Sequence, residues 1–125
     1  MEIIKEIKGA PAPVGPYSIA TRGAGLLFCS GQIALDPSTN ALVEGGIEAQ
    51  TERVMESLKA VLEGAGSSWG SVLMTTIFLS DMANYKVVNE IYSRYVSPDA
   101  PPARQTVAVR ELPKSVLVEI SVIAE

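Results

Sequence analysis

The sequence contains no histidine and only one cysteine among its 125 residues, and both absences restrict its chemistry. Without histidine there is no imidazole general base, no serine–histidine–aspartate triad and no histidine metal ligand. A single cysteine excludes a disulfide within the chain and a zinc cluster built from thiolates. Any reaction must therefore use guanidinium, amine, carboxylate, hydroxyl and backbone groups.

Long apolar runs and a surplus of basic residues are also absent. No apolar run approaches the roughly 20 residues that span a bilayer. The N-terminal MEIIKEIKGA is short and of mixed charge, unlike a signal or transit peptide. The formal net charge is −4, whereas binding to phosphates needs clustered Lys and Arg. We therefore expect a cytoplasmic protein with no membrane segment and no nucleic-acid partner.

The spacing of apolar residues predicts two helices and several short strands. A three- and four-residue period over 47–62, ended by the glycines of 64–66, predicts an amphipathic helix of about five turns. A second helical period covers 82–96. Pro/Gly stretches predict loops at 9–17 and 36–46, and β-branched runs predict strands. The predicted strands are 2–7, 18–22, 26–30, 71–81, 104–110 and 116–124.

This order of elements predicts an α+β fold. The length suits a single domain, which we assign to residues 1–125, and the 47% of hydrophobic residues suits a filled core. Two helices are expected to cover one face of a mixed, six-stranded sheet.

The last two predicted strands bring an arginine and a glutamate together if they pair as a hairpin. Alternation places Arg104 and Thr106 on one side of their strand and Val107 on the other. In the final strand, Val118 and Glu119 likewise point to opposite sides. Matching the valine faces of the two strands puts Arg104 and Glu119 on the same side of the sheet.

Two interpretations of this pair remain open at this point. It is either a cross-strand ion pair that contributes about 0.2–1 kcal/mol, or a site in which Arg104 binds a carboxylate while Glu119 handles protons. Spacing alone does not choose between them.

Six stretches, in this order and spacing, resemble the Rid (YjgF) family of enamine and imine deaminases. Its C-terminal signature is specific: Pro-Ala-Arg at 102–104 is followed by Val-Glu-Ile at 118–120. The stretches span essentially the whole chain and read PAPVGPYSIA, LLFCSGQIALDP, EAQTERVMESLKAVLEGAGSS, TTIFLSDMANYKVVNEIYSRY, PPARQTVAV and LPKSVLVEISVIA.

The resemblance implies a fold, an assembly and a reaction. Members are similar to chorismate-mutase-type homotrimers, in which three sheets form a central barrel and clefts between neighbouring chains hold the active sites. The implied substrates are 2-aminoacrylate-type enamines and their imine tautomers, which pyridoxal-phosphate enzymes release from serine or threonine. Water converts them to 2-keto acids and ammonia, with no metal or cofactor in the deaminase itself.

Matching positions carry the family's site residues onto this chain. Arg104 would bind the substrate carboxylate, Glu119 would position the water or pass a proton to the leaving amine, and Tyr17 would close the pocket. The implied substrate-binding positions are Ser30, Gly31, the backbone of Thr106 and, as a weaker candidate, Asn89.

Some positions depart from the family pattern or have a simpler interpretation. Gln105 stands where a small residue is usual and is expected to project away from Arg104. Thr106 stands where cysteine is common, which removes a thiol. Cys29 is interpreted as a core or interface thiol. The tyrosines at 85, 92 and 95 are interpreted as packing on a helix face.

Two other functions remain as alternatives to the deaminase. One is a non-catalytic module that binds 2-keto acids or partner proteins in the same clefts. The other is an endoribonuclease or translation inhibitor, an activity attached to some family members. The absence of histidine and the acidic charge balance disfavour this last reading.

Overall fold

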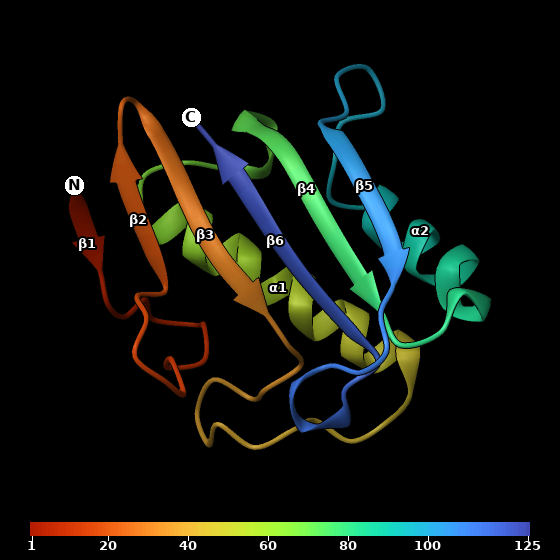
Figure 1. The fold of residues 1–125 in the computed structure, drawn as a ribbon. Helices are drawn as coiled ribbons and strands as arrows, with labels where there is room; N and C mark the ends of the chain where they lie inside the picture. The colour runs from red at the N-terminus through yellow and green to blue at the C-terminus, as the bar shows by residue number, and fades with distance from the viewer.

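Two α-helices lie against one face of a six-stranded mixed sheet in the computed structural model, which describes all residues from 1 to 125 (Figure 1). The strand order is β1-β2-β3-β6-β4-β5, and every neighbouring pair is antiparallel except β4 with β5. The predicted α+β architecture is therefore confirmed. The strands are β1 (Glu2–Ile4), β2 (Ala20–Gly23), β3 (Leu26–Gln32), β4 (Val72–Leu79), β5 (Ala103–Ala108) and β6 (Val118–Ala124).

The two helices form where the apolar period predicted them. Helix α1 runs over Ile47–Gly64, and Gly66 follows it with the positive φ of +80° that ends many helices. Helix α2 is shorter than predicted, over Tyr85–Ser93, and a 3-10 turn at Met82–Asn84 precedes it. Asp81 begins that turn by accepting a hydrogen bond from the backbone N–H of Ala83 at 2.9 Å.

The hydrophobic core lies between the helices and the sheet. Alternate residues of β4 and β6 point to the helices, and most of them are 0–2% exposed, as are the apolar residues of α1 that face the sheet. They include Ile77, Leu79, Val118, Ile120, Val122, Val54, Leu58 and Val61. None of the helices is long and apolar enough to cross a membrane.

The other face of the sheet, which we call the open face, carries apolar side chains that nothing in the chain covers. Ile3, Phe28 and Val107 point to this face by register, and they are between 42% and 51% exposed. Leu73, on β4, is also 43% exposed. Such a surface is unusual for a protein that stays monomeric.

The predicted hairpin of the last two strands is wrong. Strand β5 pairs with β4, in parallel, at the edge of the sheet, whereas β6 lies between β3 and β4 (Figure 1). The connection from β4 to β5 runs through α2, and such a strand–helix–strand crossover makes the two strands parallel, which a hairpin cannot do. The connection from β5 to β6 then carries the chain past β4.

This topology also overturns the predicted side of Arg104. Arg104 pairs with Thr75, and Thr75 with Val122, so all three point to the helices. Glu119 pairs with Phe78 on the open face. The valine faces were matched wrongly, because Val107 points to the open face while Val118 points to the core. Arg104 and Glu119 therefore lie on opposite faces.

We predict a large difference in stability between an isoleucine of the central strand and one of the edge strand. Replacing the fully buried Ile120 with Ala should lower the free energy of unfolding by about 2–5 kcal/mol, because it leaves a cavity. The matched change Ile3→Ala, at a position 51% exposed, should cost less than about 1 kcal/mol. Urea denaturation followed by circular dichroism measures both. Equal losses would contradict this topology.

Candidate functional site

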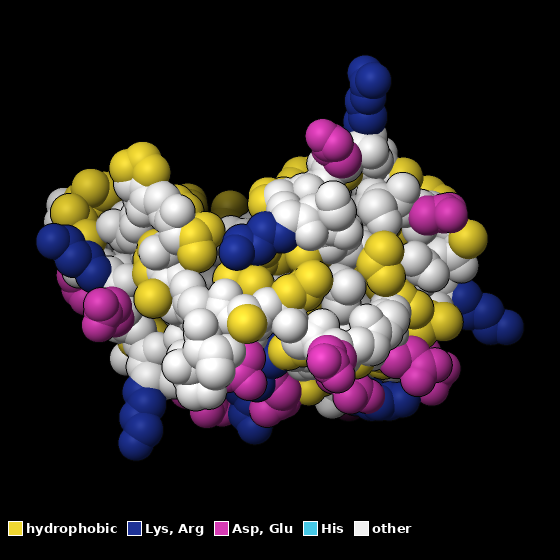
Figure 2. Space-filling view, turned by 90° about the horizontal axis from the view of Figure 1, so that it is seen from below, with side chains coloured by type: hydrophobic (Ala, Val, Ile, Leu, Met, Phe, Trp, Pro, Cys, Tyr) yellow, Lys and Arg dark blue, Asp and Glu magenta, His cyan; other side chains and the backbone are white.

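A hollow opens on the open face near the ends of β3 and β6 that lie lowest in Figure 1. Its volume is about 330 Å³. Seen from below, the molecule is notched between two raised parts, and a basic side chain lies in the notch with hydrophobic side chains beside it (Figure 2). The lining residues are Val14, Tyr17, Ser30, Gly31, Ile33, Pro113 and Glu119. Four of the seven predicted site residues are therefore brought together: Tyr17, Ser30, Gly31 and Glu119.

A bulge in β3 shapes the wall of the hollow. Cys29 pairs with Val122 and Gln32 with Ile120, so β3 advances three residues while β6 advances two. Bulges of this kind re-aim side chains and are frequent beside functional sites. The extra residue falls at the Ser30–Gly31 step, next to Glu119.

Gly31 lets the Glu119 carboxyl group approach the backbone of β3. A Cβ atom at position 31 would lie 2.8 Å from Oε2 of Glu119 and 2.9 Å from its Cδ. No side chain fits there unless the carboxyl group moves. The glycine is required for close approach and not for an unusual φ.

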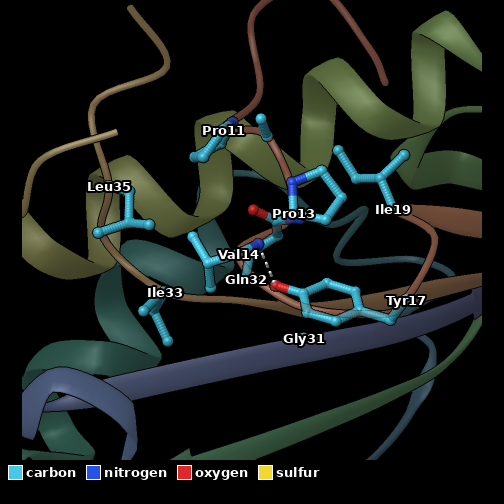
Figure 3. A pocket seen from close by; sticks show the side chains of 10 residues that line it. Pro11, Pro13, Val14, Tyr17, Ile19, Gly31, Gln32, Ile33 and Leu35 are labelled. Atoms are coloured by element: carbon cyan, nitrogen blue, oxygen red, sulfur yellow. Dashed lines mark hydrogen bonds between the residues drawn. The ribbon is translucent and has the colours of Figure 1, made fainter. Parts of the chain in front are cut away.

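The hydroxyl groups of the hollow have defined hydrogen-bond roles. The Tyr17 hydroxyl accepts a hydrogen bond from the backbone N–H of Val14 at 3.2 Å, as Figure 3 shows. Its own proton is therefore free to be donated to a ligand. The Ser30 hydroxyl donates its proton to the Ser18 carbonyl at 2.7 Å, so toward a ligand it can only accept.

Glu119 is a partly buried carboxyl group with no cation beside it. Burial raises its pKa above the ordinary value of 4.5. No ion pair in the chain includes it. A carboxyl group in this state can give or take a proton closer to neutral pH than an exposed one can.

Arg104 lies away from the hollow. It lies on the second strand from Glu119, about 10 Å away across the sheet, displaced three residues along the strand direction, and on the opposite face. Its Nη2 donates to the Tyr85 hydroxyl at 3.1 Å, and its guanidinium carbon lies 5.0 Å from the centre of the Tyr92 ring. A single chain therefore holds the predicted site residues in two groups.

The remaining predicted residues belong to the Arg104 group. Thr106 points to the same side of β5 as Arg104, and its hydroxyl oxygen is buried without a hydrogen-bond partner. Asn89 lies on α2, where its hydrogen bond and the charge of Arg104 hold the pKa of Tyr85 below the ordinary value of 10.0. Gln105 points away from Arg104, as expected, and donates to Thr76 at 3.3 Å.

The interpretation of the three tyrosines as packing holds for Tyr92 and for Tyr95, which packs against the core, and fails for Tyr85. Tyr92 is buried, while Tyr85 is 37% exposed and bonds to Arg104. In the sequence, the position of Tyr85 one helical turn before Asn89 was the feature that could have marked Tyr85 as a candidate site residue. Cys29 is buried, as expected, and burial raises its pKa to about 12. No group of three or more Cys, Asp or Glu side chains is placed to hold a metal ion.

Comparison with known proteins identifies relatives over the whole length of the chain. The family model described as endoribonuclease L-PSP matches residues 7–125. The chain is 44% identical over 115 residues to a chloroplastic Reactive Intermediate Deaminase A of Arabidopsis thaliana, covering 92% of this chain and 61% of that protein.

Solved structures also resemble the chain, in both fold and sequence. A protein of unknown function of the conserved Rid family from Yersinia pestis has a TM-score of 0.92 and 46% identity, covering 97% of this chain and 96% of the other. The TdcF protein of E. coli with bound serine has a TM-score of 0.90 and 32% identity, covering 99% of this chain and 98% of the other.

We predict that Glu119 lowers stability at neutral pH. Because its folded-state pKa is raised, the folded chain holds the proton more tightly than the unfolded chain. The contribution of the Glu119 carboxyl group to the free energy of unfolding is fully present below pH 4.5. It is lost as the pH rises through the pKa of Glu119 in the folded chain. Glu119→Gln should therefore melt at a higher temperature than the wild type at pH 7, and at the same temperature near pH 4.

The control for this prediction is Glu6→Gln, a change at an exposed position between β1 and β2, outside any helix. It should show no such dependence on pH when melting is followed by calorimetry at both pH values. A Glu119→Gln variant that melts lower than the wild type at pH 7 would contradict the prediction.

Proposed function

Because this chain belongs to the Rid (YjgF) family, we propose that it is a deaminase that hydrolyses reactive enamines and imines to 2-keto acids and ammonia. The proposed substrates are 2-aminoacrylate, 2-iminopropanoate and 2-iminobutanoate, and the enzyme is a hydrolase of C=N bonds. The observation that carries the proposal is the partly buried Glu119 carboxyl group, held against Gly31 in a hollow beside the Tyr17 hydroxyl.

The chemistry of the hollow suits hydrolysis of an imine. Water adds to the imine carbon and the C–N bond of the resulting carbinolamine breaks, so that the nitrogen leaves as ammonia and the oxygen remains in the keto acid. Glu119 takes a proton from the water and returns one to the departing amine. The Tyr17 hydroxyl donates a hydrogen bond to the intermediate and keeps its proton. An imine carbon is already electrophilic, so positioning supplies much of the acceleration.

The carboxylate-binding arginine is proposed to come from a second copy of the chain. Arg104 and Glu119 are on opposite faces of one chain, so one substrate cannot contact both. In a homotrimer, the Arg104 group of one chain can meet the hollow of its neighbour. The uncovered apolar side chains of the open face support such an assembly, because burying them against other copies is favourable.

The charge of the outer helix face bears on the endoribonuclease alternative. A polyanion such as RNA would meet the acidic outer face of the helices, which Figure 2 shows along one side of the molecule. The exposed acids of that face are Glu48, Glu52, Glu56, Glu63 and Glu90.

A cytoplasmic location stays a prediction, which fluorescence microscopy of a tagged chain tests.

We predict that the protein accelerates keto-acid release in a coupled assay. A pyridoxal-phosphate-dependent threonine dehydratase generates the intermediate, and an NADH-dependent reductase reports the 2-keto acid. Arg104→Ala should lower kcat/KM by at least about tenfold, because a hydrogen bond to a charged group is lost. The matched control is Arg94→Ala, which removes an arginine from the outer surface of α2 and its ion pairs with Glu52 and Glu90.

The possible outcomes separate the three functions. Acceleration that Arg104→Ala abolishes and Arg94→Ala leaves intact supports the deaminase. Absence of acceleration, together with binding of 2-oxobutanoate in calorimetry, favours a binding module. Cleavage of RNA that is lost in Glu119→Gln, without acceleration of keto-acid release, favours an endoribonuclease.

We also predict that two inactive variants restore activity when they assemble together. If each site takes Glu119 from one chain and Arg104 from its neighbour, mixed trimers of Arg104→Ala and Glu119→Gln chains contain some intact sites. Random mixing at equal amounts leaves about a quarter of the sites with both residues. Refolding the two variants together should restore up to that share of wild-type kcat.

The control is each variant refolded alone, which should remain inactive. A mixture as inactive as its components, while light scattering shows mixed assemblies, would contradict a site shared between chains. Light scattering that shows a monomer would contradict the assembly itself.

A further inference from the structure

Arg104 is held in place by aromatic side chains and not by a carboxylate. Its guanidinium carbon lies 5.0 Å from the centre of the Tyr92 ring and 5.7 Å from that of Tyr85. No Asp or Glu forms an ion pair with it. The negative faces of the rings stabilise the cation while leaving its charge available to an incoming anion.

The two tyrosines differ in what their hydroxyl groups do. The Tyr92 hydroxyl donates to the Thr75 hydroxyl at 3.0 Å, and both residues are buried, so the Tyr92 ring is a fixed floor beneath the guanidinium. The Tyr85 hydroxyl accepts from Nη2 of Arg104 at 3.1 Å and lies at the surface. Tyr85 therefore contacts both the arginine and solvent.

Accepting this hydrogen bond has two consequences. A guanidinium has five N–H donors in a rigid plane, and fixing one of them fixes the direction of the others. The Tyr85 hydroxyl also keeps its own proton free, because toward Arg104 it is the acceptor. That proton and the remaining guanidinium N–H groups are donors on two adjoining side chains, so they can together bind the two oxygens of one carboxylate.

We propose that Tyr85 is a positioning and specificity residue for the substrate carboxylate, orienting the Arg104 guanidinium and adding its own hydroxyl as a donor to the same carboxylate. This inference rests on the proposed function, in which Arg104 binds the carboxylate of an imine or 2-keto acid. It gives a residue of α2 a role in substrate recognition in addition to the role of Arg104.

The phenol also makes carboxylate binding sensitive to alkaline pH. Hydrogen bonding from Asn89 and the charge of Arg104 hold the pKa of Tyr85 below 10.0. When the phenol ionises, it neutralises the guanidinium and repels a carboxylate, so affinity falls as the pH rises through that pKa. Arg104, on β5, is the charged group that contacts Tyr85. In the proposed assembly the neighbour's Glu119 also faces the ligand.

The test compares Tyr85→Phe, which keeps the ring and removes the hydroxyl, with the matched change Tyr95→Phe, two residues beyond the end of α2. Tyr95 donates its hydroxyl proton to Glu56 at 2.6 Å and does not contact Arg104. Calorimetry gives the Kd of 2-oxobutanoate from pH 8 to 10, and the coupled assay gives KM and kcat.

Tyr85→Phe should raise the Kd and KM about three- to tenfold at pH 8 and leave kcat within about twofold, because carboxylate binding is the same in ground and transition states. The wild type should lose affinity between pH 8 and 10, and Tyr85→Phe should not. Tyr95→Phe should match the wild type in all of these values.

Failure of this inference is distinguishable from failure of the proposed function. If Arg104→Ala weakens 2-oxobutanoate binding but Tyr85→Phe equals the wild type in Kd and pH profile, Tyr85 has no such role. A lower kcat with unchanged KM in Tyr85→Phe also overturns the inference. If Arg104→Ala itself binds 2-oxobutanoate like the wild type, the proposed carboxylate site is wrong, and with it the role of Tyr85.

Discussion

The crossover from β4 through α2 to β5 is the constraint on which the arrangement of functional residues depends. A strand reached through a helix returns parallel to the strand it left, and here β5 lies directly beside β4, whereas β6 separates β4 from β3 in the other crossover. The last strand, β6, then fills the position between β3 and β4, where its apolar residues are buried. The side to which Arg104 points follows from this pairing.

The separation of Arg104 from Glu119 keeps each of them chemically useful. Had they been neighbours on one face, they would have formed an ion pair, which lowers the pKa of the carboxyl group and occupies the guanidinium. Instead, burial without a cation raises the pKa of Glu119, and tyrosine rings hold Arg104 without neutralising it. The chain thus presents a partly buried carboxyl group with a raised pKa and an uncompensated cation on opposite faces.

The two groups are built by different physical means. The hollow relies on backbone shape: a bulge, a glycine against a carboxyl group, and a Pro/Gly loop whose Val14 N–H bonds to Tyr17. The Arg104 group relies on side chains of α2 stacked around an edge strand. An assembly that joins them would bury the apolar open face at the same time, so folding, association and binding would depend on one surface.

The sequence by itself determined the elements and the type of fold. The apolar period of α1, the glycines that follow it and the β-branched runs are local features, and local geometry is what such patterns report. The identity of the site residues came from resemblance, and four of them do line one hollow.

Tertiary structure alone decided which strands are neighbours. Alternation gives the side of each residue only relative to its own strand, and the assumption that consecutive strands pair as a hairpin reversed the side of Arg104. The strand–helix–strand order was visible in the sequence and favoured a parallel crossover. The partner of an edge strand is still set by long-range packing, because β6 has the more apolar face and takes the central position.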